Sequence, residues 1–146
     1  MKNTILFFLA FNLCLSAYYS PGMTMLDSHQ NQSHPVCFGV TDEGDSNFLS
    51  FRDYNGSTNG GDYHVILLTW FASYWGLCQA EAPKIQSLYN QHYDEGLRVF
   101  TFGLDWGSMD CDAWGETFDL SFPILDDSYY NIFPMITDNY YIPHNV

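Results

Sequence analysis

The sequence is poor in basic residues. Its 146 residues include only 4 Lys and Arg against 17 Asp and Glu, which gives a formal net charge of −13. A surface this acidic repels phosphate groups, so we expect neither nucleic acid nor an anionic membrane surface as a partner. The charge favours a soluble protein and says nothing about its fold.

The sequence also lacks the patterns of a metal or cofactor site. It contains 4 Cys and 5 His, but no two cysteines form a CxxC pair. The histidines are scattered, and no Cys/His cluster has the spacing of a zinc site. We therefore expect no metal, and the sequence indicates no organic cofactor.

Apolar residues, in contrast, are abundant. Hydrophobic residues make up 47% of the chain and aromatic residues 18%. This composition excludes a disordered chain and indicates a packed core. The length is that of a single domain.

The first 17 residues have the features of a secretory signal peptide. A lysine at position 2 precedes an apolar run over residues 5–15, and small residues follow at positions 16 and 17. The run is shorter than the roughly 20 residues of a membrane-spanning helix. We predict export to the periplasm or the extracellular space, and an uncleaved N-terminal anchor is the alternative. Export would place three cysteines in an oxidising compartment, and their odd number would leave at least one unpaired within the chain.

The rest of the chain predicts strands alternating with helices. We expect residues 18–36 to be a polar linker and residues 37–54 to form two short strands around an acidic turn. The run HVILLTWF over residues 64–71 is apolar without alternation, which is typical of a central strand covered on both faces. A helix over 78–95 and a second apolar strand over 97–104 follow, so the two strands should be parallel.

Shorter elements complete the prediction. Pro83 lies inside the first helix and should kink it, and Gly96 is placed to cap its end. Weaker patterns predict a short helix over 110–119, a strand over 122–125 and a last helical turn over 129–133, capped by the acidic residues before it.

The segment after the first buried strand contains a distinctive motif. Residues 71–74 read FASY, residues 76–78 read GLC, and residues 78–83 read CQAEAP. This segment resembles the thioredoxin-like superfamily, and most closely its TlpA-type and redoxin (AhpC/TSA) branch. FASY matches the approach to the family's CxxC motif, GLC matches the second half of CxxC, and CQAEAP matches C-x-x-E-x-P. Residues 103–105, 126–127 and 141–145 match later family segments, in the right order. The resemblance covers 37–146 and implies an α/β fold with a central mixed sheet flanked by helices and an N-terminal β-hairpin.

The resemblance also implies a thiol–disulfide exchange site. Position 75 corresponds to the attacking nucleophile and Cys78 to the cysteine that resolves the mixed disulfide. Glu81 corresponds to a carboxylate that influences thiol protonation, and Pro143 to a cis-proline that faces the redox centre. The substrate would be a protein disulfide or thiol, or a small peroxide. Five further residues are expected to line the substrate cleft: Tyr74, Gly76, Leu77, Trp106 and Ile142.

One residue departs from the family pattern. The first cysteine of CxxC is replaced by Trp75, whose indole cannot act as a nucleophile. Three interpretations remain open. Trp75 stands for a UGA codon that encodes selenocysteine, or it is genuine and the domain is a redox-inactive binding module, or the chemistry runs through Cys78 with another cysteine.

Two further expectations concern the cysteines and the end of the chain. Cys111 follows the second strand and is a candidate second redox thiol, able to reach Cys78 if their loops share one sheet edge, while Cys37 is expected to face the core. In related folds the chain continues after the cis-proline with a hairpin and a helix. Only three residues follow Pro143, so we expect these elements to be missing and one sheet edge to be unpaired.

Overall fold

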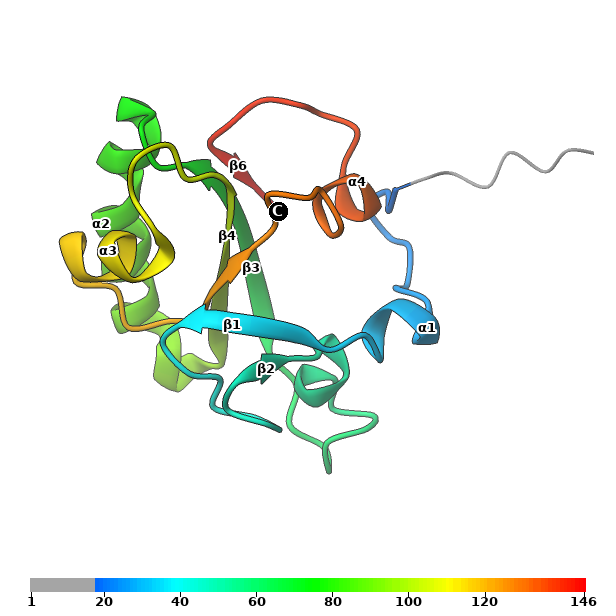
Figure 1. Ribbon diagram of the computed structural model, residues 1–146. Helices are drawn as coiled ribbons and strands as arrows, with labels where there is room; N and C mark the ends of the chain where they lie inside the picture. The colour runs from blue at the N-terminus through cyan, green and yellow to red at the C-terminus, as the bar shows by residue number, and fades with distance from the viewer. Residues whose placement is uncertain (1–17) are drawn as a thin grey trace, which may run out of the picture.

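The computed structural model describes residues 18–146, and the predicted signal peptide lies outside the described residues. Six strands form one mixed sheet in the order β2-β1-β5-β4-β3-β6. Helices flank the sheet (Figure 1). The elements, in chain order, are α1 (Asp27–Gln30), β1 (His34–Phe38), β2 (Phe48–Leu49), the 3-10 helix η1 (Phe51–Tyr54), β3 (Val65–Ala72), α2 (Gly76–His92), the 3-10 helix η2 (Tyr93–Glu95), β4 (Leu97–Asp105), α3 (Cys111–Thr117), β5 (Ile124–Asp126), α4 (Phe133–Ile136) and β6 (His144–Asn145).

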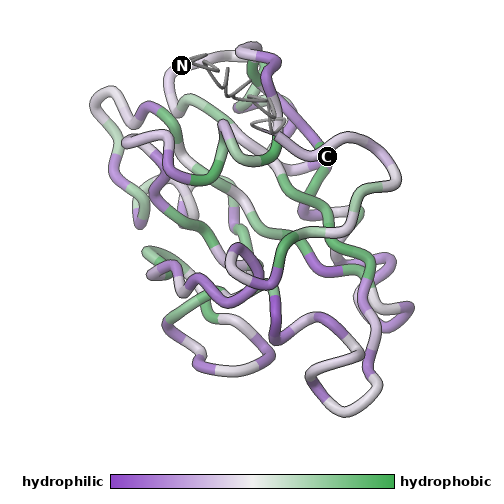
Figure 2. Tube along the Cα trace, turned by 90° about the vertical axis from the view of Figure 1, so that its right-hand side faces the viewer, coloured by the Kyte–Doolittle hydropathy of each residue, from purple (hydrophilic) through white to green (hydrophobic). Residues whose placement is uncertain are grey.

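The centre of the sheet confirms the strand–helix–strand prediction. Strands β3 and β4 are parallel, and β4 is also parallel to β5. Strands β1 and β2 form the predicted antiparallel pair, and β1 and β6 pair antiparallel with β5 and β3. Figure 2 shows strongly hydrophobic segments through the middle of the molecule and hydrophilic segments in the peripheral loops.

Alternate residues of the central strands enter two separate hydrophobic clusters. Trp70 and Phe102 stack at 4.8 Å between ring centroids and belong to the cluster beneath η1 and α4. Phe71, the next residue of β3, stacks on Trp114 of α3 at 4.2 Å and belongs to the cluster beneath α2 and α3. Both faces of β3 and β4 are therefore covered, as the unbroken apolar runs predict.

Helix α2 begins two residues earlier than predicted, at Gly76, and contains Pro83. The helical segment ends in the short η2, whose C-cap is Gly96 with φ 96°. A left-handed residue at a helix end favours glycine, because other residues meet a steric penalty there. The predicted cap is confirmed.

The N-terminal region differs from the expected polar linker. It contains α1 and the first residues of β1, and Tyr19 and Met25 pack against the core. The Tyr19 N–H also donates to the Met135 carbonyl at 3.2 Å. Because these contacts are made by isolated apolar residues in a polar stretch, no periodic pattern in the sequence predicts them.

One feature near the C-terminus also differs. The last helical turn is α4, four residues later than predicted at its start, because the Asp127 carboxylate accepts the N–H groups of the loop residues Asn131 and Ile132 and of Phe133, the first residue of α4. The C-terminal residues add the short strand β6 to the sheet beside β3. Leu68 and Val146 exchange two backbone hydrogen bonds there, at 2.8 and 2.9 Å. Within the described residues, no helix has the length and hydrophobicity needed to span a bilayer.

Candidate functional site

The candidate site lies where β3 ends and α2 begins. Trp75 is the N-cap residue of α2, with extended backbone angles and no side-chain cap bond. Its side chain is 46% exposed. The first N–H groups of a helix have no partner within the helix, and they carry the positive end of the helix dipole. Any group at position 75 therefore meets solvent and a positive local potential.

Cys78 lies three residues further on and is buried. It is 2% exposed and packs in the cluster that contains Phe71, Ala82 and Trp114. Burial raises the pKa of the Cys78 thiol above its usual value, and the Glu81 charge adds to the shift. A raised pKa leaves little thiolate at neutral pH, so Cys78 is a poor first nucleophile.

Glu81 and the residues after Pro143 join α2 to the edge of the sheet. The Asn145 amide donates to the Glu81 carboxylate at 2.9 Å. Asn145 belongs to β6, which pairs with β3 through Thr69. The Ile142–Pro143 peptide bond is cis. The segment matched to the family's proline loop therefore lies beside the helix that carries Cys78.

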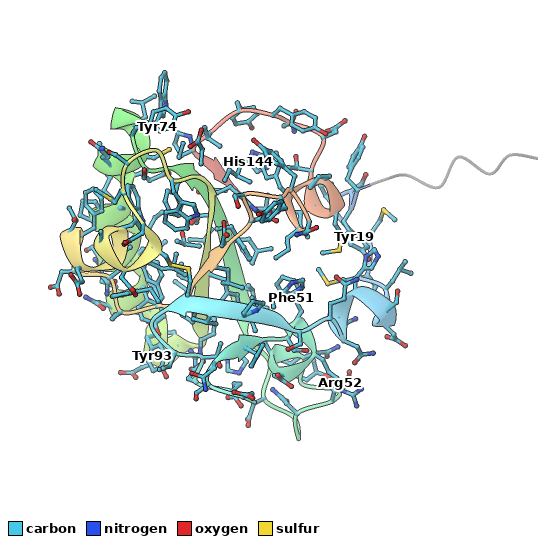
Figure 3. All side chains as sticks on the ribbon, viewed as in Figure 1. Tyr19, Phe51, Arg52, Tyr74, Tyr93 and His144 are labelled. Carbon is cyan, nitrogen blue, oxygen red and sulfur yellow. A yellow bond between two sulfur atoms is a disulfide. The ribbon has the colours of Figure 1, made fainter. Side chains whose placement is uncertain are left out.

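A small cleft lies next to the start of α2. Its volume is about 120 Å³. Two predicted cleft residues, Tyr74 and Ile142, line it. In Figure 3, Tyr74 lies at the same end of the molecule as His144, which follows Pro143. The remaining lining residues are Ala72, Leu104, Asp105, Tyr130, Phe133 and Tyr140.

The other predicted cleft residues lie outside this cleft. Gly76 and Leu77 are exposed on the first turn of α2. The Trp106 ring packs edge-on against Phe71 at 5.3 Å, and its indole N–H donates to Asp126 at 2.9 Å. A Cβ on Gly103 would collide with that ring. The Trp106 ring therefore packs against β4, and it is not among the residues that line this cleft.

Two carboxylates stand at the ends of the parallel strands β4 and β5. Asp105 accepts the Tyr74 hydroxyl at 3.2 Å and the Gly107 N–H at 3.0 Å. The Asp105 charge raises the pKa of the Tyr74 hydroxyl. Burial alone would raise the pKa of Asp126, but hydrogen bonds from Trp106 and Ser128 outweigh it, and the pKa is lowered. This end of the sheet is therefore negatively charged.

Comparison with known proteins finds sequence similarity to a thiol-disulfide oxidoreductase. The chain is 27% identical over 112 residues to the thiol-disulfide oxidoreductase ResA of Oceanobacillus iheyensis, a match that covers 73% of this chain and 54% of ResA. The chain thus spans about half the length of that relative. No protein-family model matches.

Solved structures decide the fold. Peroxiredoxin Q of Xanthomonas campestris superposes with a TM-score of 0.59 at 11% identity, covering 86% of this chain and 72% of that one. The thioredoxin domain of a Bacteroides vulgatus thiol-disulfide oxidoreductase gives 0.55 at 16% identity, covering 80% and 79%. The chain has a thioredoxin-like fold. At these identities the structural likeness shows the fold alone.

The chain pairs its cysteines differently from the prediction. Cys37 of β1 and Cys111 at the start of α3 form a disulfide, with their Cα atoms 6.1 Å apart. Cys111 is therefore neither a free redox thiol nor a partner of Cys78. The reason is that α3 packs over β1. This packing brings Cys111, the first residue of α3, next to Cys37. Cys78 is the free cysteine of the described residues.

Sequence reasoning missed the most connected polar residue of this end of the protein. Asp127 is fully buried, and its carboxylate accepts the Trp70 indole N–H and the N–H groups of three residues that precede or begin α4. The sequence suggests Asp127 as part of a helix cap and of a segment matched to the family, and assigns it no role in the site. Its signal was an acidic residue directly after a buried strand. The described residues contain no cluster of three or more His, Cys, Asp or Glu side chains that could hold a metal ion.

Proposed function

We propose that the protein is an exported thiol–disulfide oxidoreductase of the redoxin type, with its nucleophile at position 75 and Cys78 as the resolving thiol. One observation carries the proposal. The exposed N-cap position of α2 lies three residues before a buried free cysteine. The sequence similarity to ResA supports the same reaction class. The disulfide between Cys37 and Cys111 fits an oxidising compartment.

The reaction needs a selenolate or thiolate at position 75. That group attacks one sulfur of a substrate disulfide, the S–S bond breaks, and the second sulfur leaves as a thiolate that takes a proton. Deprotonated Cys78 then attacks the mixed bond and releases the first sulfur. The substrate gains two electrons and becomes a dithiol, while residues 75 and 78 become joined. An external thiol reductant returns them to the reduced state.

Trp75 cannot perform the first step, because an indole is only a hydrogen-bond donor. We propose that the tryptophan stands for a UGA codon read as selenocysteine in the native gene. The local structure fits this assignment. Position 75 is open to a substrate and meets the helix N-terminus, which favours an anion. Cys78, with its raised pKa, suits the second step and not the first.

Two neighbouring residues, Glu81 and Pro143, would assist the exchange reaction. Glu81 raises the pKa of Cys78 through its charge, so it would keep the resolving thiol protonated until the mixed disulfide has formed. Pro143 would present the adjoining backbone to the substrate chain. Both roles rest on the resemblance together with the hydrogen bond from Asn145 to Glu81.

The test is a variant that restores a chalcogen at position 75. We expect Trp75→Cys to catalyse reduction of insulin by dithiothreitol. Trp75→Ser keeps the backbone and supplies no such nucleophile, so it should be inactive, as should the parent with Trp75. Adding Cys78→Ser to Trp75→Cys should trap the mixed disulfide and stop turnover. A folded Trp75→Cys variant that is no more active than Trp75→Ser would contradict the proposal, and peroxide consumption by the same variant would favour a peroxidase.

A second function is favoured by the exposed apolar surface around position 75. Tyr74, Trp75 and Leu77 are 59%, 46% and 63% exposed. Aromatic residues on a surface are frequent anchors of protein interfaces. If Trp75 is genuine, a redox-inactive binding module is the alternative. Binding of an unfolded, cysteine-blocked polypeptide that is lost in Trp75→Ser, with no activity in Trp75→Cys, would favour it.

A further inference from the structure

The cleft beside position 75 combines aromatic rings with a carboxylate. The buried ring of Phe133 lies between two tyrosines, with its centroid 6.2 Å from that of Tyr130 and 5.9 Å from that of Tyr140. On the other side stand Tyr74 and Asp105, joined by a hydrogen bond. All five residues line the same cleft.

The rings are accessible although the base of the cleft is buried. Phe133 is 1% exposed, whereas Tyr130, Tyr74 and Tyr140 are 47%, 59% and 73% exposed. A ligand entering the cleft would therefore meet several aromatic side chains at once.

The segment that carries Tyr130 is held in place. Tyr130 has φ 54°, a left-handed backbone conformation that is unusual for a residue with a bulky side chain. Its N–H donates to the Asp127 carbonyl at 2.8 Å, and the buried Asp127 carboxylate accepts the N–H groups of the residues that follow. Strained residues persist where the surrounding structure fixes them, and they gather at functional sites. The cleft is thus preorganised.

The charge in the cleft is negative and lacks a cation. Asp105 forms no ion pair within the described residues; the one arginine found in such a pair, Arg98, bonds to Asp42. None of the residues that line the cleft is Lys or Arg. Asp126, at the end of the neighbouring strand, does not line the cleft, but its lowered pKa adds a second negative charge at this end of the sheet. Aromatic faces and carboxylates both attract cations.

The size of the cleft limits what can occupy it. Binding sites for small organic ligands usually measure about 300 to 1,000 Å³, whereas this cleft measures about 120 Å³. It accommodates one side chain of a polypeptide and not a whole cofactor.

We propose that this cleft binds a lysine or arginine side chain of the substrate polypeptide, next to the disulfide that reacts at position 75. The cation would lie against the tyrosine rings and face Asp105. The inference rests on the proposed function for its biological role, because it defines the substrate of that same site as a basic polypeptide. The overall charge of −13 would aid capture of such a substrate.

The test uses three short peptides that each contain a cysteine. They differ at one position near it, where the residue is lysine, norleucine or glutamate. In the binding arm, serine replaces the cysteine, and the full chain with Trp75 is titrated by tryptophan fluorescence. We expect the lysine peptide to bind about tenfold more tightly than the norleucine peptide. Added salt should reduce the difference. In the redox arm, the cysteine carries a fluorescent thiol in a mixed disulfide, and Trp75→Cys should show the same preference in kcat/KM.

Matched pairs of variants test whether the preference for lysine depends on the residues that line the cleft. Asp105→Asn should abolish the preference for lysine, whereas Asp94→Asn, an exposed acidic residue on η2, should leave it unchanged. Tyr140→Leu should weaken the preference, whereas Tyr129→Leu should not, since Tyr129 is 84% exposed and does not line the cleft.

The outcomes separate this inference from the proposed function. Equal or tighter binding of norleucine, no effect of Asp105→Asn, or no binding of any peptide would overturn the inference. A preference for lysine in the binding arm together with an inactive Trp75→Cys variant would leave the inference standing and refute the redox function. An active Trp75→Cys variant that does not distinguish the peptides would do the reverse.

Discussion

The disulfide between Cys37 and Cys111 should make a large contribution to stability. It closes a loop with a sequence separation of 74 residues and joins β1 to the start of α3. The loop-closure entropy removed from the unfolded chain corresponds to about 4.5 kcal/mol for a loop of this length. For a domain of this size, we expect a decrease in Tm of about 15 °C when the bond is lost.

The assay is thermal unfolding followed by circular dichroism, with and without reductant. Replacing both Cys37 and Cys111 by serine should lower Tm by this amount, and reductant should then have no further effect. Reduction of the unsubstituted protein should give a similar decrease. Cys78→Ala is the matched control, since it removes a buried cysteine that is not in the bond and should stay sensitive to reductant.

One result would refute the reasoning about the cysteines. Peptide mapping without reduction should recover the Cys37 and Cys111 peptides as one joined species, with Cys78 as a free thiol. A species that joins Cys78 to Cys111, or a Tm that reductant does not change, would show that the bond is not the stabilising element described above.

Two more predictions concern buried polar side chains. Burial lowers the pKa of His34 and of His144 below 6.5, with the Asp127 charge opposing the shift at His34. The unfolded chain therefore binds protons first as the pH falls from about 6.5 toward the folded-state values. The free energy of unfolding, measured by urea titration, should be lower at about pH 5 than at about pH 7.5, and the difference should shrink in His144→Gln. Asp127→Ala should lower the free energy of unfolding by about 3 kcal/mol, because it leaves buried N–H groups without an acceptor; the exposed Asp126→Asn should cost far less, and equal losses would contradict this account.

The central elements of the fold could be predicted because their patterns are local. Strands β3 and β4 are unbroken apolar runs, and α2 follows with an apolar face and a glycine at its end. Buried parallel strands and their crossover helix leave this pattern in any sequence. The burial of both strands is confirmed for the same reason.

The parts that could not be predicted depend on contacts between distant residues. The bond between Cys37 and Cys111 requires α3 to cover β1. No local pattern in the sequence indicates which helix packs over which strand. The packing of Tyr19 and Met25 against the core, and the loop that Asp127 holds ahead of α4, also arise from tertiary contacts. The hydrogen bond from Trp106 to Asp126 also joins residues far apart in the chain, so no local pattern indicates which way that ring faces.

The chemical identity of residue 75 in the native protein tests the central claim most directly. It is measured by sequencing codon 75 with its downstream RNA and by mass spectrometry of the corresponding peptide from the source organism. The account predicts a UGA codon with a selenocysteine-type hairpin and a peptide that contains selenium. A UGG codon and a tryptophan-containing peptide would contradict the redox mechanism and leave the binding role of the exposed indole.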